Sequence, residues 1–268
     1  GLVSTMLSGP IDGDKMDYLY RDSLHAGVPY GRQFDAPRVI ASLCLNESGN
    51  GIAISEKGRT AAELMVFARY VMFSEVYWHP AVRSATAMLQ RTVYELRHAL
   101  NPATFLTRGD DAVRELIGQT AAKTSVADLC DGLFGARRQL YKRVTQFSYC
   151  DQPEMFGKLS RRPYTTLVKL SQYLAGELSQ KLGELVHPSD VLVDAPPPGL
   201  EVQFKVDVKM ERSQGFRQLG EISPVVQALA TKQFDDFVKR VRIFVHPRLR
   251  DQCSAAIVGR ILSNWSED

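Results

Sequence analysis

The sequence predicts a mainly α-helical protein, in which a helical part ending near residue 186 is followed by a smaller α+β lobe over residues 187–268. Two observations predict this fold class. Long stretches free of Gly and Pro, of which residues 59–78 are the clearest, carry apolar side chains at a period of 3.6 residues, as amphipathic helices do. After residue 186, the segments 190–194 and 202–210 alternate apolar and polar residues, which indicates half-buried strands.

Residues typical of helix boundaries support the other helices. Pro10 and Gly27 bound the first predicted helix, because proline suits a first turn and glycine a C-terminal cap. Pro80 begins a helix that runs to about Leu100, and Ser125 is a candidate N-cap. The remaining expected elements are helices over 110–117, 125–133, 163–186, 223–237 and 251–265, a strand over 240–246, and a small β-hairpin within 39–54.

Composition and charge are those of an ordinary globular protein. The chain has 268 residues, 44% of them hydrophobic and 24% charged, with a net charge of +3. This mild positive excess does not indicate a nucleic-acid partner. No apolar run approaches the roughly 20 residues that span a bilayer, and no signal peptide is evident. We therefore expect a cytoplasmic protein that does not enter a membrane.

Several common site motifs are absent from the sequence. It contains no G-x-x-x-x-G-K-[ST], no G-x-G-x-x-G, no H-E-x-x-H and no G-x-S-x-G. The five histidines form no pair at a spacing of three or four, and the four cysteines form no C-x-x-C. These absences argue against P-loop, Rossmann, zincin and hydrolase-elbow chemistry, and against a disulfide framework or zinc site.

The helix predicted between Pro10 and Gly27 carries a face rich in ionisable groups. Asp14, Tyr18, Asp22 and His25 stand at positions i, i+4, i+8 and i+11, which places them on one side. A solvated charged face is the simplest explanation. The mixture of carboxylate, phenol and imidazole within about three turns also suits a binding site.

Residues 9–22 resemble the segment that carries the last metal-binding aspartate of HD-domain phosphohydrolases. Their sequence is Gly9-Pro-Ile-Asp-Gly-Asp-Lys-Met-Asp-Tyr-Leu-Tyr-Arg-Asp22. The closer resemblance is to the branch of deoxynucleoside triphosphate triphosphohydrolases (dNTPases). It continues along the chain through Phe34-Asp35, Arg38, Lys57, Ala68-Arg69, Val76-Tyr77, His79, Arg138 and Lys142. The resemblance implies that residues 1–186 are the C-terminal part of an HD-like helical domain that is incomplete at its N-terminus.

The family holds one divalent metal with a His, a His-Asp pair and a distant Asp. The resemblance makes Asp14 that last ligand, and a carboxylate oxygen suits Mg²⁺, Mn²⁺ or Fe²⁺. No histidine precedes His25, so the upstream ligands are missing. Either the chain is a truncated piece or it is a homologue that lost its site. In both cases we expect this chain alone neither to hold the metal nor to turn over substrate.

The resemblance also implies the substrate contacts. Lys15 and Arg69 would meet the triphosphate, Lys as a point charge and Arg as a two-pronged donor. Tyr18 and Asp22 would contact the sugar, with Asp22 at the 3′-hydroxyl, and Tyr77 would disfavour a 2′-hydroxyl. The implied products are a deoxynucleoside and inorganic triphosphate. Each residue has a structural alternative: the cations could be surface or salt-bridged groups, and the tyrosines could belong to the core.

A weaker part of the resemblance concerns regulation. In the vertebrate relative, basic residues that match Arg38, Lys57, Arg138 and Lys142 grip activator nucleotides between subunits. This implies a nucleotide activator and a dimer or tetramer. Two alternatives to dNTP hydrolysis stay open: an HD phosphohydrolase acting on another nucleotide phosphoester, and a non-catalytic module that binds nucleotides or forms oligomers.

Overall fold

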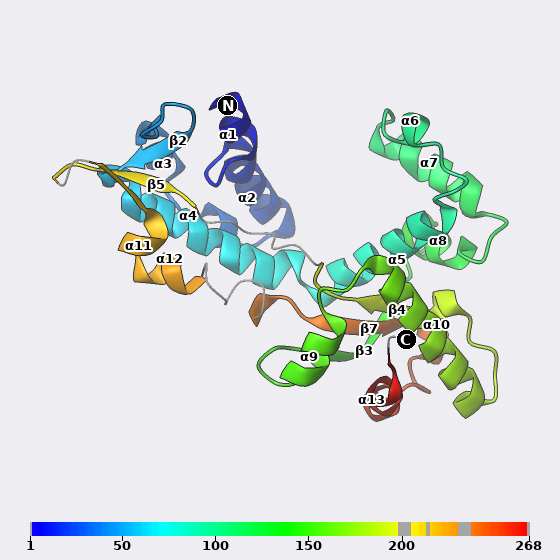
Figure 1. Cartoon of the computed structure of the whole chain (residues 1–268). Helices are drawn as coiled ribbons and strands as arrows, with labels where there is room; N and C mark the ends of the chain where they lie inside the picture. The colour runs from blue at the N-terminus through cyan, green and yellow to red at the C-terminus, as the bar shows by residue number, and fades with distance from the viewer. Residues whose placement is uncertain (1, 198–204, 213–214, 230–236, 267–268) are drawn as a thin grey trace. The chain divides into compact units, whose positions relative to one another are not determined.

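The computed structural model describes residues 2–197, 205–212, 215–229 and 237–266, and Figure 1 shows their elements. They form two compact units. Unit 1 comprises the described residues of 1–78 and 199–239, and unit 2 those of 79–198 and 240–268. Helices dominate both units and two small sheets complete them, as the fold class predicted. The units do not follow the boundary that we placed between residues 186 and 187, because strands late in the chain pair with strands far earlier.

Unit 1 combines helices with a four-stranded sheet. Its sheet order is β1-β2-β5-β6, with β2 and β5 parallel and the other pairs antiparallel. Its helices and strands are α1 (Leu2–Ser8), α2 (Gly13–Ala26), α3 (Ala36–Ala41), β1 (Leu43–Leu45), β2 (Ile52–Ser55), α4 (Arg59–Met72), the π-helical turn η3 (Phe73–Tyr77), β5 (Asp207–Met210), β6 (Gly215–Gln218), α11 (Leu219–Ile222) and α12 (Pro224–Ala228), with short 3-10 turns at Tyr30–Arg32 and Glu56–Gly58.

The core of unit 1 lies between its sheet and α4. Ile54 of β2 and Val208 of β5 are fully buried and pack with Met65 and Met72 of α4. Leu19 brings α2 into the same cluster. Apolar burial of this kind contributes roughly 25 cal/mol per Å² of apolar surface, so it fixes the position of α2 relative to α4.

Unit 2 is built around the three-stranded antiparallel sheet β3-β7-β4. Its helices and strands are α5 (Pro80–Leu96), α6 (Pro102–Phe105), α7 (Asp110–Ala121), α8 (Ala127–Phe134), β3 (Lys142–Phe147), α9 (Pro153–Leu159), α10 (Tyr164–Leu182), β4 (Val191–Asp194), β7 (Val241–Val245) and α13 (Ala255–Asn264), with 3-10 turns at Pro188–Asp190 and Pro247–Leu249.

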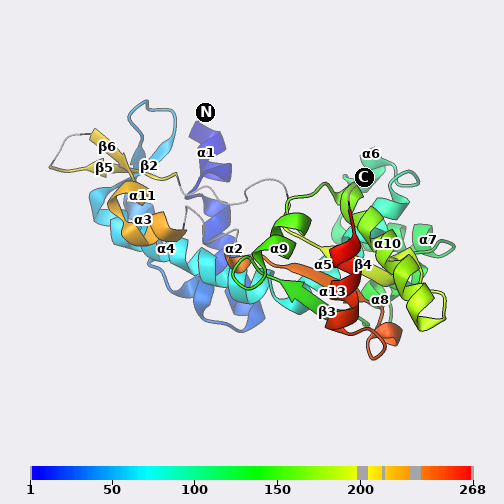
Figure 2. The same ribbon diagram turned by 60° about the horizontal axis from the view of Figure 1, so that its bottom comes forward.

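Helices cover both faces of the unit 2 sheet (Figure 2). Val193 and Ile243 face a cluster shared with α10 and α13, while Leu192 and Phe244 face a cluster shared with α5 and α8. We predicted half-buried strands here, and for β4 this was wrong. Even Asp194 is only 2% exposed, because α5 covers the face toward which it points.

Several boundaries differ from the predicted ones. The first site helix begins at Gly13 and not near Pro10, because Asp12 caps it. The hairpin begins at Leu43, since the preceding residues form α3. Ser125 is not the cap of α8, which has Val126 at its N-cap position. Residues 202–204 of the predicted strand 202–210 and residues 230–236 of the predicted helix 223–237 lie outside the described residues.

Within the described residues, no helix combines the length and the apolar character that a membrane span requires.

Candidate active site

Helix α2 presents the predicted site residues and has well-defined ends. The Asp12 carboxylate accepts the Lys15 backbone N–H at 2.7 Å, which caps the N-terminus. Gly27 ends the helix with φ of +69°, a left-handed conformation that suits glycine. The positions of Asp14, Tyr18 and Asp22 on one face follow from this uninterrupted helix.

Asp12 and Lys15 also form an ion pair at the start of α2. The Lys15 ammonium donates to the second oxygen of Asp12 at 2.5 Å, and the Asp12 side chain is fully buried while that of Lys15 is 19% exposed. Asp14, between them, is exposed. We assigned no role to Asp12 from the sequence, and the structure adds this contact with Lys15.

The most specific contact of the site joins Tyr77 to Asp22. The Tyr77 hydroxyl donates to the Asp22 carboxylate at 2.8 Å, although 55 residues separate the two. The rings of Tyr18 and Tyr77 pack edge to face, with their centroids 6.1 Å apart. Phe73 packs in the same way on Tyr77 at 5.0 Å. The structure therefore brings together Tyr18, Asp22 and Tyr77, and adds Phe73.

Arg69 lies beside Tyr18, on the buried side of α4. The residue is 4% exposed. Burial raises the pKa of the Tyr18 hydroxyl, while the charge and hydrogen bonding of Arg69 oppose that rise. Burial also raises the pKa of Tyr77 far above its ordinary value, and the hydrogen bond to Asp22 adds to the increase. Both phenols are protonated at neutral pH, so each can donate a hydrogen bond.

Four of the five predicted substrate contacts thus form one cluster: Tyr18, Asp22, Arg69 and Tyr77. Lys15 is one turn from Tyr18 on α2. The cluster offers hydrogen-bond donors, one carboxylate acceptor and aromatic ring edges. Groups of these kinds can bind a hydroxyl of a sugar that lies next to an anionic group.

The predicted activator contacts fall into two groups. In unit 1, the Arg38 Nε donates to the Lys57 carbonyl at 3.1 Å, and the Lys57 ammonium lies 3.5 Å from Glu211. Arg138 and Lys142 belong to unit 2, and both are exposed. The structure thus brings Arg38 together with Lys57.

The described residues do not complete a metal site. Among them, no group of three or more His, Cys, Asp or Glu side chains is placed to hold a metal ion. Asp14 is a suitable oxygen donor, but a single carboxylate does not define a coordination sphere.

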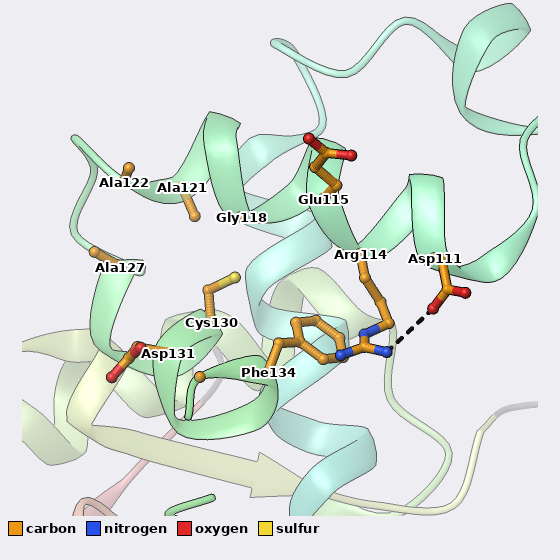
Figure 3. Close-up of a pocket in the computed structure, with 11 residues that line it drawn as sticks. Asp111, Arg114, Glu115, Gly118, Ala121, Ala122, Ala127, Cys130, Asp131 and Phe134 are labelled. Atoms are coloured by element: carbon orange, nitrogen blue, oxygen red, sulfur yellow. Dashed lines mark hydrogen bonds and ion pairs between the residues drawn. The ribbon is translucent and has the colours of Figure 1, made fainter. Parts of the chain in front are cut away.

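A separate pocket of about 550 Å³ lies in unit 2 between α7 and α8 (Figure 3). Arg114 lies over the Phe134 ring, 5.5 Å from its centroid, and 3.3 Å from Asp111. Cys130 lines the same pocket, and burial raises the pKa of its thiol. None of the predicted site residues lines this pocket.

One known protein family matches most of the chain. Residues 34–262 match the family described as "HD associated region". The chain belongs to the HD-associated region family. This membership agrees with the predicted relationship to HD-domain proteins.

Other members and structural neighbours extend beyond this chain. An uncharacterized protein of Methanocaldococcus jannaschii is 31% identical over 236 residues, which are 85% of this chain and 48% of that protein. The chain thus spans about half the length of this relative. Two crystal structures share the fold of this HD-associated region. A hypothetical protein from Aquifex aeolicus has a TM-score of 0.60 at 22% identity, covering 93% of this chain and 58% of that one. A phosphohydrolase from Bacteroides thetaiotaomicron has a TM-score of 0.55 at 18% identity, covering 91% and 63%.

Proposed function

We propose that the longer protein containing this region is a metal-dependent phosphohydrolase that cleaves deoxynucleoside triphosphates. In this reaction a water oxygen bonds to the α-phosphorus, the bond from that phosphorus to the 5′-oxygen breaks, and deoxynucleoside and inorganic triphosphate leave. Membership in the HD-associated region family supports the hydrolase class. The observation that carries the substrate class is the Tyr77–Asp22 hydrogen bond beside Tyr18.

This pair suits a deoxyribose better than a ribose. Asp22 keeps acceptor positions after it accepts the Tyr77 hydroxyl at 2.8 Å, so it can also accept a 3′-hydroxyl. The Tyr77 ring is held from two sides by Phe73 and Tyr18. A ring fixed in this way would fill the space that a 2′-hydroxyl needs.

Two cations are available for the triphosphate. Arg69 is buried and lies next to Tyr18, and Lys15 stands at the N-terminal end of α2, where helix backbone N–H groups also favour an anion. The Asp12 carboxylate holds the Lys15 ammonium in place before substrate arrives. We assign these two side chains to phosphate neutralisation.

We assign Asp14 to the metal as one ligand of several. The other ligands would come from the part of the longer protein outside these 268 residues. The relative from Methanocaldococcus jannaschii is about twice as long as the region that it shares with this chain. The bound metal would lower the pKa of a water molecule and polarise the phosphoryl oxygen.

The test uses the longer protein with Mn²⁺ and dGTP. We expect release of inorganic triphosphate, and we expect Asp14→Ala to abolish it. Asp17→Ala is the matched control, since Asp17 is exposed on the same helix and forms an ion pair with Arg21 across one turn. Activity retained by Asp14→Ala would contradict the ligand assignment. Release of phosphate or pyrophosphate instead of triphosphate would favour another phosphoester substrate, and absence of any cleavage would favour a non-catalytic module.

We also propose, as a separate point, that Arg38, Lys57, Arg138 and Lys142 bind an activator nucleotide in a dimer or tetramer. Arg38 and Lys57 already contact each other in unit 1. Sedimentation of the longer protein with and without dGTP tests this, and an oligomeric state that does not respond to nucleotide argues against it.

A further inference from the structure

The helix that carries Arg69 and Tyr77 changes type between them. Helix α4 is regular to Met72, and the chain then continues as the π-helical turn Phe73–Tyr77. The Trp78 N–H donates to the Phe73 carbonyl at 2.8 Å, five residues back. The sequence of the π-helical turn, Phe-Ser-Glu-Val-Tyr, contains no Gly or Pro that would interrupt a regular α-helix. Such turns make up well under 1% of residues and are frequent at functional sites.

The turn changes the direction in which Tyr77 points. In a regular α-helix each residue adds about 100°, so eight residues from Arg69 to Tyr77 add about 800°, which leaves Tyr77 about 80° away from the Arg69 face. A π turn closes its hydrogen bond one residue later, so it absorbs about one extra residue, or about 100°. Tyr77 then returns to within about 20° of the Arg69 face.

The contacts agree with this change of direction. Arg69 interacts with Tyr18 on α2, and Tyr77 bonds to Asp22, one helical turn further along the same face of α2. Phe73, at the first position of the turn, packs on the Tyr77 ring at 5.0 Å. In a straight α-helix, Val76 would come closest to the Arg69 face, and Tyr77 would point aside.

Resting on the proposed function, we infer that the π turn Phe73–Tyr77 is the device that selects Tyr77, and not Val76, for the sugar side of the site. Phe73 and the turn are positioning elements, since neither needs to touch the substrate. The preference of the enzyme for deoxyribose over ribose then depends on the direction in which residue 77 points from the helix axis, as well as on residue 77 being a tyrosine.

The first test does not depend on activity. The ten tyrosines of this chain can be labelled with ¹³C at Cζ and observed by NMR, and the Tyr77 signal is the one that Tyr77→Phe removes. Asp22→Asn should shift this signal, because the acceptor of its hydroxyl changes. In the double variant Val76→Tyr/Tyr77→Val, the relocated tyrosine should not respond to Asp22→Asn. A response equal to that of the native chain would overturn the inference.

A second variant keeps the test decisive if the exchanged pair does not fold. Deletion of Glu75, which is exposed, reduces the spacing between Arg69 and Tyr77 from eight positions to seven. Seven α-helical residues add about 700°, only about 20° short of two full turns, so the turn should become α-helical and Tyr77 should still respond to Asp22→Asn. Glu75→Ala is the control of unchanged length. Loss of the response on deletion, but not in Glu75→Ala, would also overturn the inference.

The enzymatic arm uses the longer protein. In Val76→Tyr/Tyr77→Val, the ratio of kcat/KM for dGTP to that for GTP should fall at least about tenfold, because a steric clash or an unsatisfied polar group discriminates between substrates on this scale. After deletion of Glu75, the ratio should stay within about threefold of native. If the protein cleaves no nucleoside triphosphate, the proposed function fails, while the NMR result still decides the role of the turn. An unchanged ratio in the exchanged variant, with native activity, would refute control of sugar choice by the turn.

Discussion

Arg83→Met should destabilise unit 2 more than any exposed ion-pair substitution, because it leaves a buried carboxylate. Asp194 accepts two hydrogen bonds from Arg83, at 3.0 and 2.5 Å, and its side chain is 1% exposed. Removing one partner of a buried pair costs about 3–5 kcal/mol. Arg242 lies opposite Asp194 in the neighbouring strand, and its Nε and Nη1 have no hydrogen-bond partner among the residues that the structure describes. Arg242 can turn toward the carboxylate, so we expect a loss near 3 kcal/mol.

Urea unfolding measures this loss. Trp265 reports on unit 2 once Trp78 of unit 1 is replaced in a Trp78→Phe background. Arg114→Met is the matched control, because its ion pair with Asp111 is exposed and should contribute about 0–1 kcal/mol. Equal losses in Arg83→Met and Arg114→Met would refute the reasoning from burial.

Three further predictions concern the free energy of unfolding in urea. Trp78 in a Trp265→Phe background reports on changes in unit 1, and Trp265 reports on changes in unit 2 as above. Tyr77→Phe should cost about 1–2 kcal/mol, because it removes a hydrogen bond to a half-buried carboxylate, and a cost near zero would mean that water replaces it fully. Gly27→Ala should cost about 1 kcal/mol through its left-handed φ, whereas Gly118→Ala inside α7 should add about 0.5–1 kcal/mol of stability; effects of the same sign would contradict this. Burial raises the pKa of Tyr164 from 10.0 to about 12, so its contribution is complete below pH 10 and is lost as pH rises to 12. The decline should be at most about 1.4 kcal/mol per pH unit, and Tyr164→Phe should flatten it.

Local signals were enough to predict the helix that carries the site. Capping chemistry and a 3.6-residue period predict α2, and the resulting face places Asp14, Tyr18 and Asp22 correctly on one side. The ion pair of Asp12 with Lys15 is local, at a spacing of three residues, but the complete burial of the Asp12 carboxylate depends on tertiary packing and could not be predicted. The cap signal itself was available in the sequence Asp12-Gly-Asp-Lys15.

Contacts between distant segments could not be predicted from periodicity. Strand β3 is not among the elements that the sequence predicted, because its partner β7 lies about 100 residues later. The Tyr77–Asp22 hydrogen bond likewise joins two segments that are far apart in the sequence. A period of 3.6 assumes a uniform helix, and the π turn departs from that period at the position where the site is built.

The parallel pairing of β2 with β5 has a consequence for synthesis. Ile54 and Val208 are neighbours in one core although 154 residues of chain separate them. While a ribosome makes this chain, β2 therefore exposes an unpaired edge until residues 207–210 have emerged, and at roughly 5–20 residues per second this interval lasts about 10–30 s. A recombinant piece ending at residue 78 would keep that edge permanently, so it should associate or aggregate instead of folding as an independent domain.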